Sequence, residues 1–422
     1  MSAPAHSLMS AHMFDPRRIR QDFPLLNEAP LAQGLHYLDN AATTHKPQTV
    51  IDSISDGYTR YYSPIHRGLY PLAEQATALY EKARQRLSNF LGASKNGELI
   101  FTRSATEAIN LVATGWAAPR LRPGDRIWVS RMEHHANYLP WQRICQQQGA
   151  ELRIIELDAQ GQLDLAACPE LFSSRTRLIA LCHLSNVLGV ENPLTELCQT
   201  ARDHDIAVLV DAAQSVSHLS IDITEIGCDF LACSAHKMYG PAGIGLLYAR
   251  ADRLGQMEPL LLGGGMVDEV GECLAPSHWA EGTARFEAGS PDLPSALGFA
   301  AAADYLDELG REPIHQHLQQ LTELAIDGLS QIPGLQLLPG AGVTPSGIVS
   351  FTLETVHPHD IAQVAGEQGV AIRAGHHCAQ PLMRSLGLAA SARASFAIYN
   401  DEQDIAALVQ AIDQARCLFS QE

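Results

Sequence analysis

Short runs of apolar residues alternate with longer segments of helical periodicity through the first three-quarters of the chain. The apolar runs have the length of buried strands, and the segments between them, such as Thr106–Trp116, Leu139–Gln148 and Leu194–His204, have the length of helices. Strands that alternate with helices form a mostly parallel sheet covered on both faces. The predicted strands are Leu99–Thr102, Arg126–Ser130, Leu152–Glu156, Leu178–Cys182, Ile206–Val210 and Asp229–Cys233.

The pattern changes twice further along the chain. The run Gly243–Tyr248 follows the preceding strand too closely for a crossover helix, so we expect it to be antiparallel. After Pro294, helical periodicity dominates residues 295–331, with a break at Gly310 and Pro313. This indicates a smaller α+β domain joined to the first by a long helix. Its predicted elements are strands Gly347–Leu353, Val370–Arg373 and Ala394–Tyr399, a helix over His359–Gln368 and a last helix from Asp401.

The length and net charge of the chain argue against several classes of protein. A chain of 422 residues is too long for one ordinary core, so two domains are expected. The formal charge of −18 argues against nucleic acid or an anionic membrane surface as a partner, because either would be repelled. No apolar run reaches the roughly 18 residues of a membrane span. The nine cysteines include no C-x-x-C pair and their number is odd, which favours a reducing, cytoplasmic location over a disulfide framework.

Candidate chemistry collects just after the predicted strands. In an open parallel sheet, ligands bind at the carboxyl ends of the strands. The residues at these positions are Ser104-Ala105-Thr106, Glu133-His134-His135-Ala136-Asn137, Ser185-Asn186, Asp211 with Gln214, and Ser234-Ala235-His236-Lys237.

Each of these groups alone has an ordinary structural explanation. Ser104–Thr106 and Asp211 are acceptable helix caps, and a single lysine such as Lys237 is usually a surface residue. His134 and His135 are adjacent and lack the H-E-x-x-H spacing of zinc ligands, so no metal site is expected.

Taken together, the groups meet the needs of one cofactor. Pyridoxal phosphate requires a lysine for a Schiff base, a carboxylate for the pyridine nitrogen, a phosphate cup and a group that stacks on the ring. Lys237, Asp211 and His134 match the first, second and fourth requirements. Ser104–Thr106 at a helix start, with Ser234 and His236, match the third.

Several segments resemble group II cysteine desulfurases, the SufS/CsdA type of the class V, fold-type I aminotransferase superfamily. They are EHHAN (133–137), DAAQ (211–214), SAHKMYGPAGIG (234–245), RFEAGSP (285–291), RAGHHCAQP (373–381) and RASFAIYN (393–400). The resemblance covers the chain from about Phe14 to its end. It implies a seven-stranded large domain over 36–300, a small C-terminal domain over 301–422, and an N-terminal arm, 1–35, that joins the small domain.

The resemblance implies a role for each matching residue. Lys237, His134 and Cys378 would be catalytic, with Cys378 accepting the sulfur of L-cysteine as a persulfide. Positive or proton-accepting character beside Cys378 would come from His376, His377 and Arg373. The expected cofactor ligands are Lys237, Asp211, Gln214, His134, Thr106, Ala105, Ser234, His236, Asn186 and, from a partner subunit, Ser290. The expected substrate ligands are Arg393, Asn186, His66, Arg67 and Arg373.

The sequence departs from the family pattern at two places. Ser104-Ala105-Thr106 replaces the usual Gly-Thr-Thr, so one phosphate-side hydroxyl is missing or moved to Ser104. The usual DGAQ is DAAQ, which raises the question of whether Ala212 fits against the cofactor.

The implied function is a homodimeric cysteine desulfurase that makes L-alanine and passes sulfur to a SufE/CsdE-like acceptor for iron–sulfur cluster assembly. The SufS and CsdA roles are not separated by the sequence. Selenocysteine lyase and cysteine sulfinate desulfinase remain alternatives, because a selenide or sulfinate leaves without help from Cys378. A class V aminotransferase would have no use for that cysteine, and a cofactor-free scaffold would have no use for Lys237 and Asp211.

Overall fold

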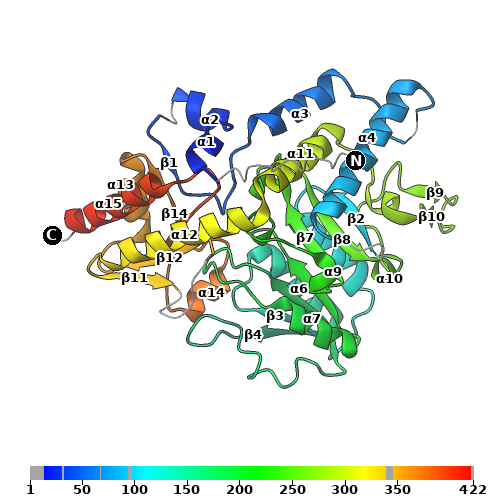
Figure 1. Ribbon diagram of the computed structural model, residues 1–422. Helices are drawn as coiled ribbons and strands as arrows, with labels where there is room; N and C mark the ends of the chain where they lie inside the picture. Colours follow the sequence, from blue (N-terminus) through cyan, green and yellow to red (C-terminus); the bar gives the residue numbers. More distant parts are fainter. Residues whose placement is uncertain (1–13, 31–32, 67, 94–96, 339–345, 420–422) are drawn as a thin grey trace, which may run out of the picture.

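The computed structural model describes residues 14–30, 33–66, 68–93, 97–338 and 346–419. Its centre is a seven-stranded sheet with strand order β2-β8-β7-β6-β5-β3-β4 (Figure 1). The pairs from β4 to β7 are parallel, whereas β8 is antiparallel to both β7 and β2. The predicted, mainly parallel sheet and its antiparallel strand are confirmed. The strands are β2 Gly97–Thr102, β3 Arg126–Ser130, β4 Glu151–Ile155, β5 Thr176–Cys182, β6 Ala207–Asp211, β7 Phe230–Ser234 and β8 Gly245–Arg250.

The inner strands are buried on both faces, which explains why they appear in the sequence as unbroken apolar runs. Along β5, Ile179 and Leu181 belong to one apolar cluster, whereas Leu178 and Ala180 belong to a second. Successive side chains of a strand point to opposite faces, so the two clusters lie on opposite sides of the sheet. Helices α4 (Pro71–Phe90), α7 (Leu194–Asp203) and α11 (Leu293–Leu309) supply the first cluster, and α5 (Ala105–Leu111) and α6 (Leu139–Gln148) the second.

The helix predicted over Thr106–Trp116 is not uniform. It is α-helical only in α5, and residues Val112–Ala117 form a π-helix. The wider turn brings Gly115 against the loop after α10 (Ala251–Leu254), where its carbonyl accepts a hydrogen bond from the backbone N–H of Glu258. Local periodicity does not reveal this, because the contact is made by a distant segment.

The C-terminal part of the chain builds a second layer around an antiparallel sheet with strand order β11-β12-β15-β14. The long helix α12 connects this sheet with the central one, and α13 and α15 lie beside it (Figure 1). The predicted break between α11 and α12 is confirmed at Gly310, whose φ of 84° ends the first helix. The elements are α12 Arg311–Ser330, β11 Leu335–Leu338, β12 Ile348–Leu353, α13 Pro358–Glu367, β14 Arg373–Gly375, α14 Gln380–Ser385, β15 Ser391–Ser395 and α15 Glu402–Phe419.

Two strand predictions in this region need correction. The strand expected over Ala394–Tyr399 lies earlier, in β15, because after Ser395 the chain turns and the N–H of Ala397 donates to the side chain of Asn400. The strand expected over Val370–Arg373 divides between two sheets. Its first half, β13 (Val370–Ala371), pairs with β1 (His36–Tyr37), and Arg373 begins β14, which pairs with β15.

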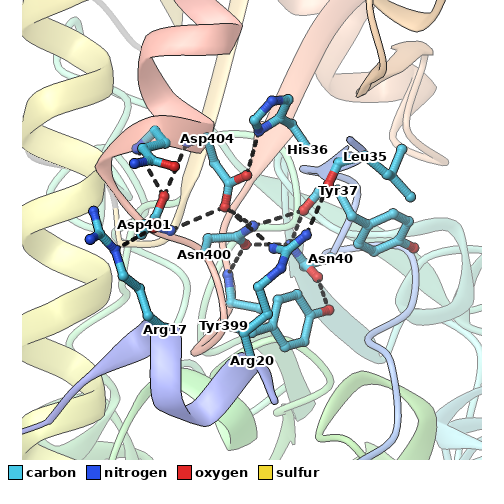
Figure 2. A network of polar contacts seen from close by, with 12 residues as sticks. Arg17, Arg20, Leu35, His36, Tyr37, Asn40, Tyr399, Asn400, Asp401 and Asp404 are labelled. Carbon is cyan, nitrogen blue, oxygen red and sulfur yellow. Dashed lines mark hydrogen bonds and ion pairs between the residues drawn. The ribbon is translucent and has the colours of Figure 1, made fainter. Parts of the chain in front are cut away.

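The N-terminal segment is attached to the C-terminal part of the chain. Arg17 and Arg20 of α1 (Pro16–Arg20) form ion pairs with Asp401 and Asp404, at 3.2 and 3.8 Å (Figure 2). The ring of His36 contacts the same Asp404 at 2.7 Å. Through these contacts the first described residues are held against the start of α15.

The remaining elements complete the layers. Helix α3 packs along α11, and the hairpin β9–β10 projects beside α10 (Figure 1). No helix within the described ranges has the length and apolar composition needed to cross a membrane. The bounds are α2 Pro24–Glu28, α3 Gln48–Thr59, α8 Ser215–His218, α9 Ile223–Ile226, β9 Val267–Glu269 and β10 His278–Trp279.

Candidate active site

A cavity of about 380 Å³ opens at the carboxyl ends of β5, β6 and β7 and is closed on its other side by the segment around β14 and β15. It brings together most of the residues predicted from the sequence. They are Ala105, Thr106, His134, Asn186, Asp211, Gln214, Ser234, His236, Lys237, Arg373, Cys378 and Arg393.

Asp211 and Lys237 share this cavity. Asp211 ends the fully buried strand β6, and its Oδ1 accepts a hydrogen bond of 2.9 Å from the N–H of Ala213. Lys237 ends a short 3-10 turn directly after β7. Burial lowers the pKa of Lys237 to about 8, against the opposing effect of Asp211, and burial also raises the pKa of Asp211. A buried amine with a lowered pKa is a good nucleophile at neutral pH.

These two groups fit pyridoxal phosphate. Among the described residues Asp211 forms no ion pair, so its buried carboxylate can receive a cationic ring nitrogen. The amine of Lys237 supplies the group that attaches to the aldehyde.

The start of α5 also lines the cavity. The N–H of Ala105 donates to Oγ of Ser234 at 2.8 Å, which leaves the hydroxyl hydrogen of Ser234 for another acceptor. Thr106 is exposed, and the ring of His236 contacts Oγ1 of Thr43 at 3.3 Å. Burial lowers the pKa of His236 to about 4, so the ring is neutral at pH 7. Hydroxyls and the first N–H groups of a helix suit a phosphate.

His134 follows β3 and is oriented by its own turn. Its Nδ1 accepts a hydrogen bond of 3.0 Å from the N–H of Ala136. Burial, with Lys237 nearby, lowers its pKa to about 3, so the imidazole is neutral and can stack on an aromatic ring. Glu133 beneath it is fully buried and accepts hydrogen bonds from Ser130 (2.5 Å) and Asn137 (2.6 Å).

Ala212, the residue at which the DAAQ segment departs from the family pattern, does not line the cavity. Ala212 is completely buried in the apolar core, and Ala213 lines the cavity in its place. Gln214 donates from Nε2 to the carbonyl of Ala41 at 2.8 Å, and Asn186 donates from Nδ2 to the carbonyl of His377 at 2.7 Å. Both amides therefore link separate parts of the chain at the cavity wall.

Cys378 is exposed, in the loop between β14 and α14. Its φ is 56° and that of His377 is 50°, so two successive non-glycine residues adopt the left-handed conformation. Of the two characters expected beside Cys378, positive charge is not available from His377 at pH 7, whereas a neutral, proton-accepting ring stays a prediction. Nε2 of His377 lies 3.0 Å from the carbonyl of Ser391, and burial lowers its pKa to about 3.

Arg393 and Arg373 lie side by side on β15 and β14. The side chain of Arg393 is 3% exposed and that of Arg373 is 49% exposed, so only the first is enclosed. Nη1 of Arg393 donates to the carbonyl of Asn186 at 2.8 Å, whereas its buried Nε has no hydrogen-bond partner among the described residues. Burial lowers the pKa of Arg393 to about 10.

Three of the predicted site residues are not found in this cavity: two line a different cavity, and the third is outside the described ranges. His66, in the loop between α3 and α4, joins Ser290 in a second cavity of about 580 Å³. Neither residue lines the cavity of Lys237. Arg67 lies outside the described residues.

Sequence reasoning missed the segment after β1. Ala41, Ala42 and Thr43 line the cavity, and Asp39 contacts both arginines from behind. The available signal was the polar and small-residue stretch 39–44, which follows a short strand as the other site segments do.

Known proteins that are similar to this chain include class-V aminotransferases and cysteine desulfurases. The family model for aminotransferase class-V matches residues 36–408. A cysteine desulfurase of Haloferax volcanii is 43% identical over 98% of this chain and 100% of its own, and one of Salmonella gallinarum is 43% identical over 94% and 97%. The crystal structure of the cysteine desulfurase CsdA from Escherichia coli is 38% identical, with a TM-score of 0.87 over 96% of this chain and 99% of that one.

A more distant structure addresses the cofactor. This structure is of the cystine C–S lyase C-DES and carries pyridoxal phosphate linked to glycine. It is 27% identical to this chain, covers 93% of this chain and 98% of its own, and has a TM-score of 0.78. The matches extend over almost the whole chain, and the cavity described above holds a lysine, a carboxylate and an exposed cysteine. The chain therefore belongs to the class-V aminotransferase family and is a pyridoxal phosphate-dependent cysteine desulfurase.

Proposed function

We propose that the protein converts L-cysteine to L-alanine and takes the sulfur onto Cys378 as a persulfide. One observation carries this assignment: Cys378 is exposed in the cavity that also contains Lys237 and Asp211. The other cysteine of this cavity, Cys182, is buried, and burial raises its pKa well above the usual value. Burial therefore disfavours a thiolate at Cys182, and Cys378 is the cysteine of this cavity that is accessible to a substrate.

We assign the cofactor ligands from their positions along the cavity. When bound, pyridoxal phosphate withdraws electrons from the substrate Cα. Asp211 would hold the proton on the ring nitrogen, and Lys237 would anchor the aldehyde. The remaining contacts are assigned to Ala105, Thr106, Ser234 and His236 for the phosphate, Gln214 for the ring oxygen, and His134 and Asn186 for the ring.

Arg393 would bind the substrate carboxylate. Its side chain is almost completely enclosed, and its Nε–H is a buried donor without a partner. A buried donor that is left unpaired costs free energy, which a ligand carboxylate would recover. Arg393 and Cys378 line the same cavity.

The sulfur transfer balances without an external oxidant. The thiolate of Cys378 attacks Sγ of the substrate, the Sγ–Cβ bond breaks, and its electron pair remains with the carbon skeleton. Lys237 would move the proton at Cα, and protonation of the carbon skeleton would complete L-alanine. The two sulfur atoms remain joined on Cys378.

The experiment is alanine formation from L-cysteine with a reductant, for the wild type, Cys378→Ala and Cys273→Ala. Cys273 is a matched control because it is an exposed cysteine in the β9–β10 hairpin. We expect the wild type and Cys273→Ala to make alanine and the yellow Cys378→Ala protein to make almost none. An unchanged rate in Cys378→Ala would contradict the assignment and favour selenocysteine or cysteine sulfinate as substrate.

We also propose a homodimer with shared sites. The support is the second cavity with His66 and Ser290, which is lined by exposed apolar side chains such as Tyr62, Tyr70 and Leu72. In a dimer this surface would cover the cavity of the partner subunit. Light scattering of the purified protein measures the mass, and a monomer with full activity would contradict the proposal.

The remaining assignments rest on the resemblance. We propose an arm over 1–35, a large domain over 36–300 and a small domain over 301–422. A SufE/CsdE-like protein in the cytoplasm would receive the sulfur for iron–sulfur cluster assembly.

A further inference from the structure

Cys378 lies on a backbone conformation that its residue type does not favour. The φ angles of His377 and Cys378 are 50° and 56°, in the left-handed region that glycine adopts readily and other residues adopt rarely. Two such residues in succession cost free energy, and they persist only where the surrounding structure holds them. The contacts that hold this loop therefore determine where the thiol of Cys378 lies.

Hydrogen bonds from two other segments hold the backbone around Cys378. The carbonyl of His377 accepts a hydrogen bond of 2.7 Å from Nδ2 of Asn186, which follows β5. The carbonyl of Cys378 accepts one of 2.7 Å from the N–H of His135. The ring of His135 also contacts the loop, because its Nε2 accepts a hydrogen bond of 3.1 Å from the N–H of Gln380. His135 therefore holds the loop at two points, once through its backbone and once through its side chain.

Gln380 needs an acceptor from outside its own helix. It is the first residue of α14, and the first N–H groups of a helix have no partner within the helix. The ring of His135 can accept this N–H only through a nitrogen that carries no hydrogen. Burial, and to a smaller extent the nearby His376, lowers the pKa of His135, so the ring is neutral at pH 7. The neutral ring, with its hydrogen on Nδ1, fits the contact.

His135 reaches the loop from outside the cavity of Lys237. His134 and Ala136 line that cavity, whereas the residue between them does not. His135 and Gln380 instead line a separate cavity of about 520 Å³. The two adjacent histidines therefore have different surroundings, and only His134 is assigned to the cofactor.

The segment that carries His135 is fixed on the central sheet. Nδ2 of Asn137 donates to the buried carboxylate of Glu133 at 2.6 Å, and Oδ1 of Asn137 accepts from Nε1 of the buried Trp141 at 2.9 Å. Glu133 also accepts a hydrogen bond of 3.0 Å from the N–H of Cys182, the last residue of β5. The ring of His135 is thus presented to the loop by a segment that buried hydrogen bonds tie to the sheet.

We propose that His135 is a positioning residue for Cys378. By holding the carbonyl of Cys378 and the N–H of Gln380, it keeps the thiol at the cavity, in a geometry that allows attack on Sγ of the substrate. The inference rests on the proposed use of Cys378 as the sulfur acceptor. Because His135 does not line the cavity, its ring should affect the rate of sulfur transfer more than the binding of cofactor or substrate.

The test compares His135→Gln with His135→Asn in the holoenzyme, with a reductant present. Both keep the backbone N–H that binds Cys378, but only the longer glutamine side chain can place an acceptor oxygen near the position of Nε2. In His135→Asn we expect kcat for alanine formation from L-cysteine to fall about tenfold or more, with KM within about twofold and the cofactor absorbance unchanged. His135→Gln should recover most of kcat. His359→Asn, at an exposed position on α13, is the matched control and should behave as the wild type.

Hydrogen exchange supplies a readout that is independent of activity. The amide of Gln380 should be protected in the wild type and in His135→Gln, and should exchange about tenfold or more faster in His135→Asn. An unprotected amide in the wild type, an unchanged kcat in His135→Asn, or a His135→Gln protein as slow as His135→Asn would each overturn the inference. Alanine formation that persists in Cys378→Ala would instead overturn the proposed function, and the exchange of Gln380 does not depend on that outcome.

Discussion

The carboxylate of Glu133 accepts a hydrogen bond of 3.0 Å from the backbone N–H of Cys182. This contact joins the segment after β3, which carries His134, to the last residue of β5. Two loops at the carboxyl edge of the sheet are thereby kept at a constant spacing. The site therefore depends on a buried acid that is not itself exposed to the cavity.

The same acid gives a prediction about pH and stability. Burial raises the pKa of Glu133 to about 7, above the value near 4.3 of an unfolded chain. A raised pKa contributes stability below the unfolded value, and this contribution is lost as the pH rises through 7. Between pH 4.5 and 7 the wild type should lose about 3 kcal/mol relative to Glu133→Gln, measured by urea unfolding. Parallel pH curves for the two proteins would contradict the assigned pKa.

Cofactor uptake should follow the ionisation of Lys237. Only the neutral amine attacks an aldehyde, and burial lowers the pKa of Lys237 to about 8. The rate at which the apoprotein acquires pyridoxal phosphate should therefore rise with pH and level off above about pH 8. Asp211 opposes the lowering, so Asp211→Asn should move the midpoint to lower pH. Absorbance after mixing reports both, and a midpoint above pH 10 would be inconsistent with a buried amine.

Replacement of Arg393 should affect substrate binding. Lysine keeps the charge but cannot make a bidentate contact or keep the hydrogen bond to Asn186 in the same geometry. Arg393→Lys should raise KM for L-cysteine about tenfold or more, with the cofactor still bound. Steady-state alanine formation checks this, with Arg384→Lys on the nearby helix α14 as control. Equal KM values for the two variants would remove Arg393 from substrate binding.

The π-helical turn gives a prediction that concerns stability alone. A Cβ on Gly115 would overlap the backbone carbonyl oxygen of Glu258, which cannot move independently of its loop. Gly115→Ala should therefore destabilise the protein by about 1–3 kcal/mol, despite the better helix propensity of alanine. Gly366→Ala, in α13, has open space around its added methyl and should be neutral or slightly stabilising. Thermal unfolding of both variants tests the pair, and equal melting temperatures would contradict it.

Much of the fold and the site could be predicted from local sequence. The strands of the central sheet are buried on both faces, so they appear as apolar runs whose length alone is informative. The residues proposed to bind the cofactor follow these strands, because parallel topology brings the carboxyl ends to one edge. Lys237, Asp211 and His134 were predicted in this way and Cys378 through its resemblance to a family segment, and all four line one cavity.

The C-terminal strands and the π-helix were predicted less well. Residues 396–399 form a buried apolar run that is not part of a β-strand. Residues 370–373 are divided between two sheets. In both places the partner strand decides the ends of the element. A pattern read along one segment contains no information about that partner.

The sequence by itself determined which residue types stand at the carboxyl edge of the sheet, and with them the cofactor and reaction class. Only the tertiary structure decided which of them meet. Asp39 is 334 positions from Arg373 and 354 from Arg393, yet one carboxylate binds both. His66 and Ser290, predicted for the same site, lie in a different cavity. The physical reason is that hydrogen bonds and charges act over a few ångströms in space, whereas spacing along the chain constrains only neighbours.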